Sequence, residues 1–143
     1  MKMRMGYRGY CTHSSFGEYR MPVPAQNIIY RDYTNKKGLH LKISVNELYF
    51  PDCFLQLHSL LNELDELEGV LMCSMFMLPQ DFDLRSQIYE SFADTGCELH
   101  FVLESLVLRT RGNFESLENI FSLRQQLPNC LETLDLKRLM KKI

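Results

Sequence analysis

The sequence of 143 residues lacks several features that would assign a function directly. It has no C-x-x-C pair, no P-loop and no G-x-G-x-x-G motif, which argues against the best-marked zinc, nucleotide and dinucleotide sites. No apolar run approaches the roughly 20 residues that span a bilayer. The formal net charge is only −2, whereas an autonomous nucleic-acid binder usually carries a basic excess. Composition therefore predicts neither a membrane partner nor a DNA partner.

Cysteine usage points to a reducing compartment. The five cysteines are far apart in the sequence and odd in number, so neither a disulfide scaffold nor a metal site is expected. The opening residues MKMRM are too short and too polar for a signal peptide. We therefore expect a cytoplasmic protein without a metal or another cofactor.

One apolar run, from Val70 to Leu78, predicts the centre of the fold. Its apolar side chains occupy both odd and even positions, whereas a strand exposed on one face would alternate apolar with polar residues. This pattern is typical of a central strand in a parallel sheet covered by helices. Ligands of such sheets bind beyond the carboxyl ends of the strands, so the segment from Ser74 to Asp81 becomes a first place to look for function.

Helical and strand patterns alternate along the rest of the chain. Pro24 and Gly38 bracket one helix, and a second has apolar residues at helical spacing between Phe54 and Leu67. Alternating strands and helices predict a parallel sheet joined by crossover helices. We expect a single α/β domain over residues 1–143. Its doubly wound, mainly parallel sheet has four or five strands with helices on both faces over 1–108, and C-terminal helices follow over 113–143.

Polar side chains gather where the predicted strands end, and loop residues on a rigid sheet often carry function. The candidates for catalysis are Ser14, Glu47 and Glu104. The candidates for ligand binding are His13, Arg20, Gln26, Asn27, Arg31, Asn46 and Gln80.

Each role has a structural alternative. Ser14 is a possible nucleophile, but loop serines also bond to their own backbone, and the adjacent His13 points the other way on an extended chain. Glu47 and Glu104 can form an acid/base pair or be solvated or paired with arginine. Arg20 and Arg31 can hold a phosphate group, although Arg31 suits a surface ion pair equally well.

The first 125 residues or so resemble the catalytic domain of serine recombinases. Gly9-Tyr10-Cys11-Thr12-His13-Ser14 is similar to the family's G-Y-x-R-x-S strand, which puts Ser14 at the nucleophile position. Thr12 replaces the arginine of that motif, and Phe76-Met77-Leu78-Pro79-Gln80-Asp81 stands for D-R-L-x-R-D, so Met77 and Gln80 occupy two further arginine positions. A phosphodiester transition state needs such cations. The resemblance therefore implies the fold, and the departures predict no recombinase activity.

A longer resemblance is to the small sporadic carbohydrate cluster proteins, which are encoded among genes for surface polysaccharides and unusual sugars. It rests on the ordered segments RGY, VPAQNIIYRDY, LNELDELEGV, FMLP and HFVLESL. It implies a protein that binds or acts on an activated or phosphorylated sugar, such as a nucleotide sugar, at the strand ends. The alternative is a non-catalytic resolvase-like interaction module that dimerises or binds a biosynthetic partner. In either case we expect a homodimer through the C-terminal helices.

Overall fold

The computed structural model describes residues 4–17 and 19–126. Residues 1–111 belong to one compact unit and the chain from Gly112 onward to a second, so each is described by itself. In the second unit, residues 114–126 are helical, as the sequence predicts after Asn113. The expected last helix falls on residues 127–143, which lie outside the described residues, as does part of the C-terminal segment 113–143 on which the homodimer contact is expected. A single domain over residues 1–143 and that dimer stay predictions.

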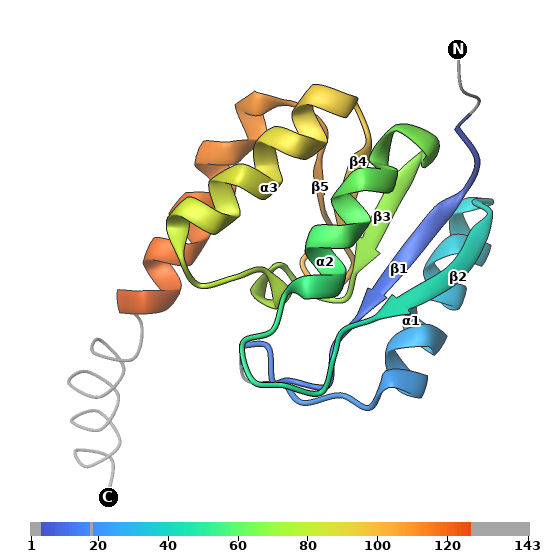
Figure 1. Ribbon diagram of the computed structural model, residues 1–143, viewed down its shortest axis with the longest axis horizontal. Helices are drawn as coiled ribbons and strands as arrows, with labels where there is room; N and C mark the ends of the chain where they lie inside the picture. The colour runs from blue at the N-terminus through green and yellow to red at the C-terminus, as the bar shows by residue number, and fades with distance from the viewer. Residues whose placement is uncertain (1–3, 18, 127–143) are drawn as a thin grey trace, which may run out of the picture. The chain divides into compact units, whose positions relative to one another are not determined.

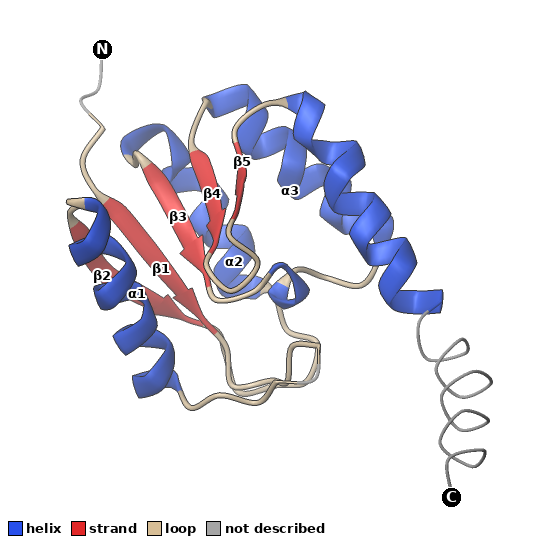
Figure 2. Ribbon diagram, turned by 180° about the vertical axis from the view of Figure 1, so that it is seen from behind, coloured by secondary structure: helices blue, strands red, loops and turns tan. Residues whose placement is uncertain are grey.

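The first unit is built on a five-stranded sheet with the order β2-β1-β3-β4-β5. The four parallel strands are β1 (Tyr7–Cys11), β2 (Leu41–Asn46), β3 (Gly69–Met72) and β4 (Glu98–Phe101), and the antiparallel edge strand is β5 (Leu106–Leu108). Helices α2 (Leu55–Leu60) and α3 (Phe82–Thr95) lie on one face and α1 (Val23–Lys37) lies on the other (Figure 1; Figure 2). The predicted doubly wound, mainly parallel sheet is confirmed.

Strand β3 is central and buried along its whole length, as predicted, but it is shorter than the apolar run. It ends at Met72, and Met75–Met77 form a 3₁₀ turn instead of more strand. The reason is Ser74, whose buried hydroxyl accepts a hydrogen bond from the Phe76 N–H at 3.1 Å. This side-chain cap satisfies the backbone locally, so the chain leaves the sheet.

The helix ends follow from local sequence. Helix α1 closes at Gly38 and helix α3 at Gly96, both of which adopt positive φ angles that suit glycine. Asp81 caps α3 by accepting hydrogen bonds from the Asp83 and Leu84 N–H groups. Within the described ranges, no helix combines the length and apolar character needed to cross a bilayer.

A buried tyrosine on α1 ties the helix to the two middle strands. The Tyr30 hydroxyl donates to the Tyr10 carbonyl on β1 and accepts from the Cys73 N–H, just past β3, at 3.0 Å. Its ring packs on Gly9, where an added Cβ would lie 2.5 Å from the ring atom Cδ2. Glycine at this position therefore lets α1 approach the sheet closely.

We expect Tyr30→Phe to lower the free energy of unfolding by about 1–3 kcal/mol, because the buried Cys73 N–H loses its acceptor. Urea unfolding followed by circular dichroism measures this cost. Tyr49→Phe is the matched control, since Tyr49 is 76% exposed and its change should cost less than about 0.5 kcal/mol. Equal stabilities of the two variants would contradict the bridging role of the Tyr30 hydroxyl.

Candidate functional site

The strand order places a topological switch point between β1 and β3. The chain leaves β1 for β2 on one side of the sheet and later returns to β3 on the other side. The loops that follow β1 and β3 therefore diverge, and a crevice opens beyond the strand ends. Open α/β sheets bind their ligands at such points.

Three loops line this switch-point crevice. Its wall comes from the chain after β1, after β2 and after β3, and includes Thr12, Ser14, Ser15, Phe16, Asp52, Cys53, Phe54, Phe76, Met77, Leu78 and Gln80. The crevice is small, at about 60 Å³, whereas sites that enclose whole small molecules usually measure roughly 300–1,000 Å³. Of the described residues that line it, none is Lys, Arg or His, and Asp52 is the one acid.

Gln26 positions the loop that carries Ser14. The side chain of Gln26 is fully buried; its Oε1 accepts from the Thr12 N–H at 3.0 Å and its Nε2 donates to the Thr12 carbonyl at 2.7 Å. Nε2 also donates to the Met21 carbonyl at 2.8 Å, which fixes the far end of the loop to α1. Ser14 itself is exposed, and its N–H donates to Thr12 Oγ1. Gln26 therefore holds the loop, and Ser14 lines the crevice.

Glu47 organises the loop after β2. Its carboxylate accepts hydrogen bonds from the Tyr10 hydroxyl at 2.7 Å and from three backbone N–H groups, those of Leu48, Gln56 and Leu57, at 3.0–3.1 Å. Burial opposes ionisation of Glu47, but these hydrogen bonds outweigh it and lower the pKa of the carboxyl. With only 3% of the residue exposed, Glu47 is a loop anchor that also caps α2.

Glu104 organises the chain after β3 in a similar way. Its Oε1 accepts from the Ser74 hydroxyl at 2.5 Å and from the Met75 N–H at 3.2 Å. Arg85, which is buried on α3, donates to the carbonyls of Pro79 and Gln80 at 3.1 and 2.6 Å. Glu104 and Glu47 thus serve separate hydrogen-bond clusters, and within the described part of the chain no hydrogen bond joins them as the predicted acid/base pair.

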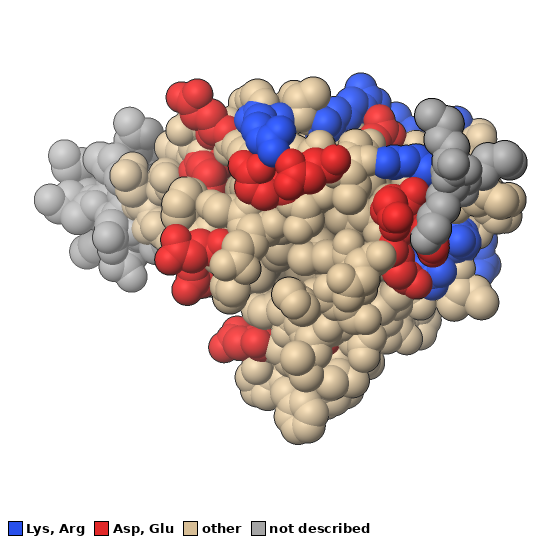
Figure 3. Space-filling view, turned by 45° about the horizontal axis from the view of Figure 1, so that its top comes forward, with Lys and Arg blue, Asp and Glu red and all other residues tan. Residues whose placement is uncertain are grey.

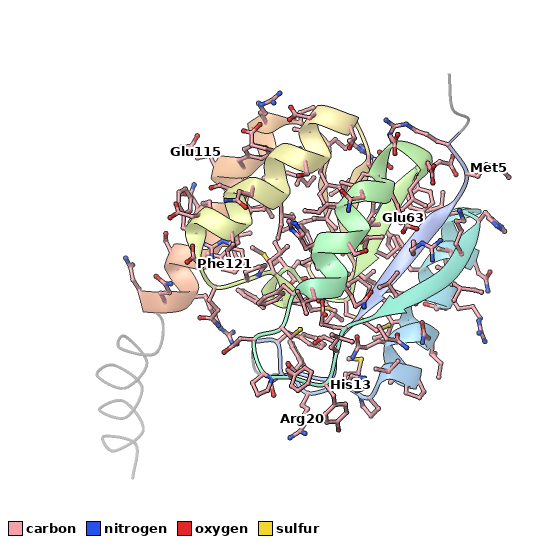
Figure 4. The ribbon with its side chains drawn as sticks, in the orientation of Figure 1. Met5, His13, Arg20, Glu63, Glu115 and Phe121 are labelled. Carbon is pink, nitrogen blue, oxygen red and sulfur yellow. The ribbon has the colours of Figure 1, made fainter. Side chains whose placement is uncertain are left out.

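The remaining predicted residues fall in two places. His13 and Arg20 lie on the exposed loop at the edge where the strands end (Figure 4), and the His13 ring packs against Tyr49 in a tilted arrangement with centroids 4.5 Å apart. Asn27, Arg31 and Asn46 line a different hollow, a groove between α1 and β2. Of the ten predicted residues, only Ser14 and Gln80 line the crevice itself.

Two structural contributors escaped the sequence analysis. Arg85 follows the cap residue Asp81 by four positions, and nothing in its sequence context distinguishes it from a surface helix arginine. Tyr30 has the spacing of a core residue, but its hydroxyl contacts are visible only in three dimensions. Among residues 4–17 and 19–126, no three His, Cys, Asp or Glu side chains gather in a way that could hold a metal ion.

A second polar cluster lies between α1 and the sheet, around the buried His100. Glu98 accepts from Tyr7 at 2.9 Å, from Arg109 at 2.6 Å and from His100 Nε2 at 3.1 Å, while the Tyr33 hydroxyl lies 2.5 Å from His100 Nδ1. Because a carboxylate only accepts, the proton of the neutral ring sits on Nε2 and Nδ1 accepts from Tyr33. Both ring nitrogens are therefore engaged inside the cluster, which reads as structural.

We expect Glu47→Gln to destabilise the fold by about 2–4 kcal/mol, because an amide cannot accept all of the hydrogen bonds that the carboxylate accepts. Chemical denaturation at neutral pH tests this. Glu115→Gln, at an exposed position, is the control and should change stability by less than about 0.5 kcal/mol. A stable Glu47→Gln protein would return Glu47 to the list of catalytic candidates.

We also expect a pH dependence that originates at His100. Burial lowers its pKa from the usual 6.5, and the contact with Glu98 offsets this only in part. Below pH 6.5 the unfolded chain takes up a proton that the folded chain resists, so stability falls with acidification and is unaffected above that pH. Burial opposes ionisation of Glu98 as well, but its hydrogen bonds lower its pKa below 4.5, so Glu98 acts only at lower pH.

Urea unfolding at about pH 7.5 and about pH 5.5 measures the His100 effect, with a slope of at most about 1.4 kcal/mol per pH unit for one proton. His100→Gln should flatten this dependence, whereas the exposed His58→Gln should preserve it. An unchanged slope in His100→Gln would contradict the assignment.

Comparison with known proteins gives a clear result for the fold. No protein-family model matches the sequence, and no curated protein does either. Among solved structures, the chain is similar to the N-terminal catalytic domain of TP901-1 integrase, with a TM-score of 0.64, 16% identity, and coverage of 88% of this chain and 98% of that one. It is also similar to a resolvase family site-specific recombinase from Streptococcus pneumoniae, with a TM-score of 0.64, 9% identity, and coverage of 96% and 99%.

These comparisons correct the predicted function. The expectation of a protein of carbohydrate biosynthesis is wrong, because the similar structures are recombinase and integrase domains and nothing supports the sugar-cluster family. The alternative of a non-catalytic interaction module gains no support from them either. The chain has the fold of a resolvase-type recombinase catalytic domain.

Proposed function

We propose that the chain acts on DNA as a recombinase-type domain, with Ser14 as the hydroxyl that attacks a backbone phosphodiester. The observation that carries this proposal is a convergence of positions. Four positions that match the serine recombinase motifs all line the switch-point crevice. Ser14 stands at the position of the motif serine, and Thr12, Met77 and Gln80 stand at the positions of the three motif arginines.

The size and position of the crevice support a reaction at a phosphate group. A volume of about 60 Å³ is too small for a nucleotide sugar but accommodates a tetrahedral group that reaches in from a chain lying outside. Ser14 is exposed on a loop that Gln26 fixes to α1, so its hydroxyl is accessible and held on a rigid support. Gln80, from the chain after β3, also lines the crevice, and its side-chain amide carries two N–H donors.

The reaction is a transesterification. Ser14 Oγ forms a bond to phosphorus, one of the two ester bonds of the phosphodiester breaks, and the departing sugar oxygen takes up the proton that Ser14 loses. Because the described lining carries no guanidinium and Asp52 adds a negative charge, the transition state receives little electrostatic stabilisation. One missing donor of this kind costs about 10²–10³ in rate. The sequence analysis predicted no recombinase activity from these missing arginines, and in this proposal they account for a slow reaction instead.

The test restores one cation. We expect Gln80→Arg to raise the rate of covalent adduct formation on supercoiled plasmid DNA by about 10²-fold. After nuclease digestion, mass spectrometry of the peptide that contains Ser14 measures the adduct. The adduct should disappear in Gln80→Arg combined with Ser14→Ala and persist in combination with Ser15→Ala, the neighbouring hydroxyl.

Gln87→Arg is the charge-matched control, since Gln87 is exposed on α3 and does not line the crevice. It should leave the adduct rate within about twofold of the original chain. No Ser14 adduct in either the original chain or Gln80→Arg, with both variants folded, would overturn the proposal.

A further inference from the structure

The switch-point crevice contains one charged side chain among its described lining residues, that of Asp52. Asp52 comes from the loop after β2 and lines the same small space as Ser14, which comes from the loop after β1. In contrast, charges of both signs lie close together over the face shown in Figure 3. The crevice therefore exposes a carboxylate and a hydroxyl to one space, with no cation among the described lining residues to neutralise the carboxylate.

The two loops that carry these residues run side by side (Figure 1; Figure 2). They leave neighbouring strands, since Cys11 at the end of β1 pairs with Asn46 at the end of β2. Further along the two loops, the His13 ring packs against Tyr49 with centroids 4.5 Å apart. The space that both loops line measures only about 60 Å³. A proton can cross such a space directly or through one water molecule.

Neither group is engaged elsewhere. The Ser14 N–H donates to Thr12 Oγ1, but among the described residues no hydrogen bond engages the Ser14 hydroxyl. Over residues 4–17 and 19–126, no hydrogen bond or ion pair engages the exposed Asp52 carboxylate either. Asp52 differs in this respect from Glu47 and Glu104, whose carboxylates hold backbone N–H groups. The Asp52 carboxylate is thus able to accept a proton from a neighbouring group.

The backbone at Asp52 does not require an aspartate. Pro51 and Asp52 form the turn of the loop, and Asp52 has a positive φ of 52°. Glycine favours this region, and asparagine tolerates it as well as aspartate does. The turn is also fixed from both sides, because Glu47 accepts from the Leu48 N–H before it and from the Gln56 N–H after it. The turn therefore holds the carboxylate in one place without needing it.

The other titratable groups around the turn are placed differently. Cys53 also lines the crevice, but its thiol donates to Glu47 Oε1 at 3.6 Å. His13 and Tyr49 pack against each other, and neither lines the crevice. Asp52 is therefore the acceptor that faces Ser14.

We propose that Asp52 is the general base of the reaction at Ser14, an inference that rests on the proposed function. As Ser14 Oγ forms its bond to phosphorus, the Oγ proton passes to the Asp52 carboxylate, and the ester bond to the departing sugar oxygen breaks. Asp52 then gives the proton to that oxygen, so the carboxylate is restored and no other reactant is consumed. A positioned base contributes about 10²–10⁴-fold to such a step.

The negative charge of Asp52 also has an effect of the opposite sign. A carboxylate in the crevice repels the negative charge of a phosphodiester. If repulsion were its only effect, removal of the charge would speed the reaction, whereas removal of a base slows it. The direction of the change in rate therefore separates the two effects.

The reaction of the full chain with bis(4-nitrophenyl) phosphate tests the role of Asp52. This phosphodiester has a good leaving group, so the rate reports how well Ser14 is activated. Release of 4-nitrophenolate gives the rate, and mass spectrometry of the peptide that contains Ser14 identifies the adduct. We expect Asp52→Asn to lower the adduct rate at least about 10²-fold. Asp65→Asn, the same change at an exposed position outside the crevice, should leave the rate within about twofold.

Asp52→Gly tests whether the carboxylate itself acts, because glycine suits the positive φ and leaves space for a small carboxylate ion. Its adduct rate should be as low as that of Asp52→Asn. Sodium formate should raise that rate at least about tenfold, whereas sodium chloride at the same ionic strength should not. Circular dichroism of each variant checks that it is folded.

Three results would overturn the role of Asp52 and leave the reaction at Ser14 in place. They are an unchanged or higher rate in Asp52→Asn, an equal loss in Asp65→Asn, and no recovery of Asp52→Gly with formate. Absence of a Ser14 adduct from every chain, with this ester and with plasmid DNA, would overturn both the role of Asp52 and the proposed function.

Discussion

The structure depends on two hydrogen bonds by which one helix side chain joins the two strands at its centre. Tyr30 bridges β1 and the chain just past β3 through a single buried hydroxyl, and Gly9 makes room for its ring. Buried backbone groups at a strand end need such a partner, because water cannot reach them. The bridge sits at the carboxyl ends of the two strands, and the crevice is lined by the loops that follow them.

The loops around the crevice follow one design. A polar side chain holds each of them: Gln26 on α1 for the loop after β1, Glu47 at the start of the loop after β2, and Glu104 beyond β4 for the chain after β3. Each of them accepts hydrogen bonds from backbone N–H groups of its loop, and none of the three lines the crevice. Glu104 keeps one carboxylate oxygen, Oε2, buried without a hydrogen-bond partner among the described residues. The side chains that remain free to meet a ligand, Ser14 and Gln80, are exposed residues on loops held in this way.

The fold could be predicted because the spacing of apolar residues and the positions of proline and glycine are local features of the sequence. The uninterrupted apolar run located β3, and Pro24 with Gly38 located α1. The end of β3 could not be predicted, since it depends on Ser74 and on Glu104, thirty residues later. The candidate site was harder for the same reason. The sequence around a loop glutamate is the same whether its carboxylate faces a ligand or a set of backbone N–H groups. The sequence therefore predicts that Glu47 and Glu104 follow strand ends, but it does not distinguish a catalytic role from a structural one.

The contact between Glu104 and the turn after β3 also has a consequence for how the chain acquires its crevice during synthesis. Met75 and Ser74 emerge from the ribosome well before Glu104, which holds them by a side chain 29 and 30 residues further on. The wall after β3 therefore cannot be completed until β4 has been made and added to the sheet. Contacts between residues so far apart in the sequence form late in folding, because ordering the chain between them costs conformational entropy. We therefore expect β1 and β2 of the nascent chain to pair while the wall of the crevice after β3, across from the Ser14 loop, is still incomplete.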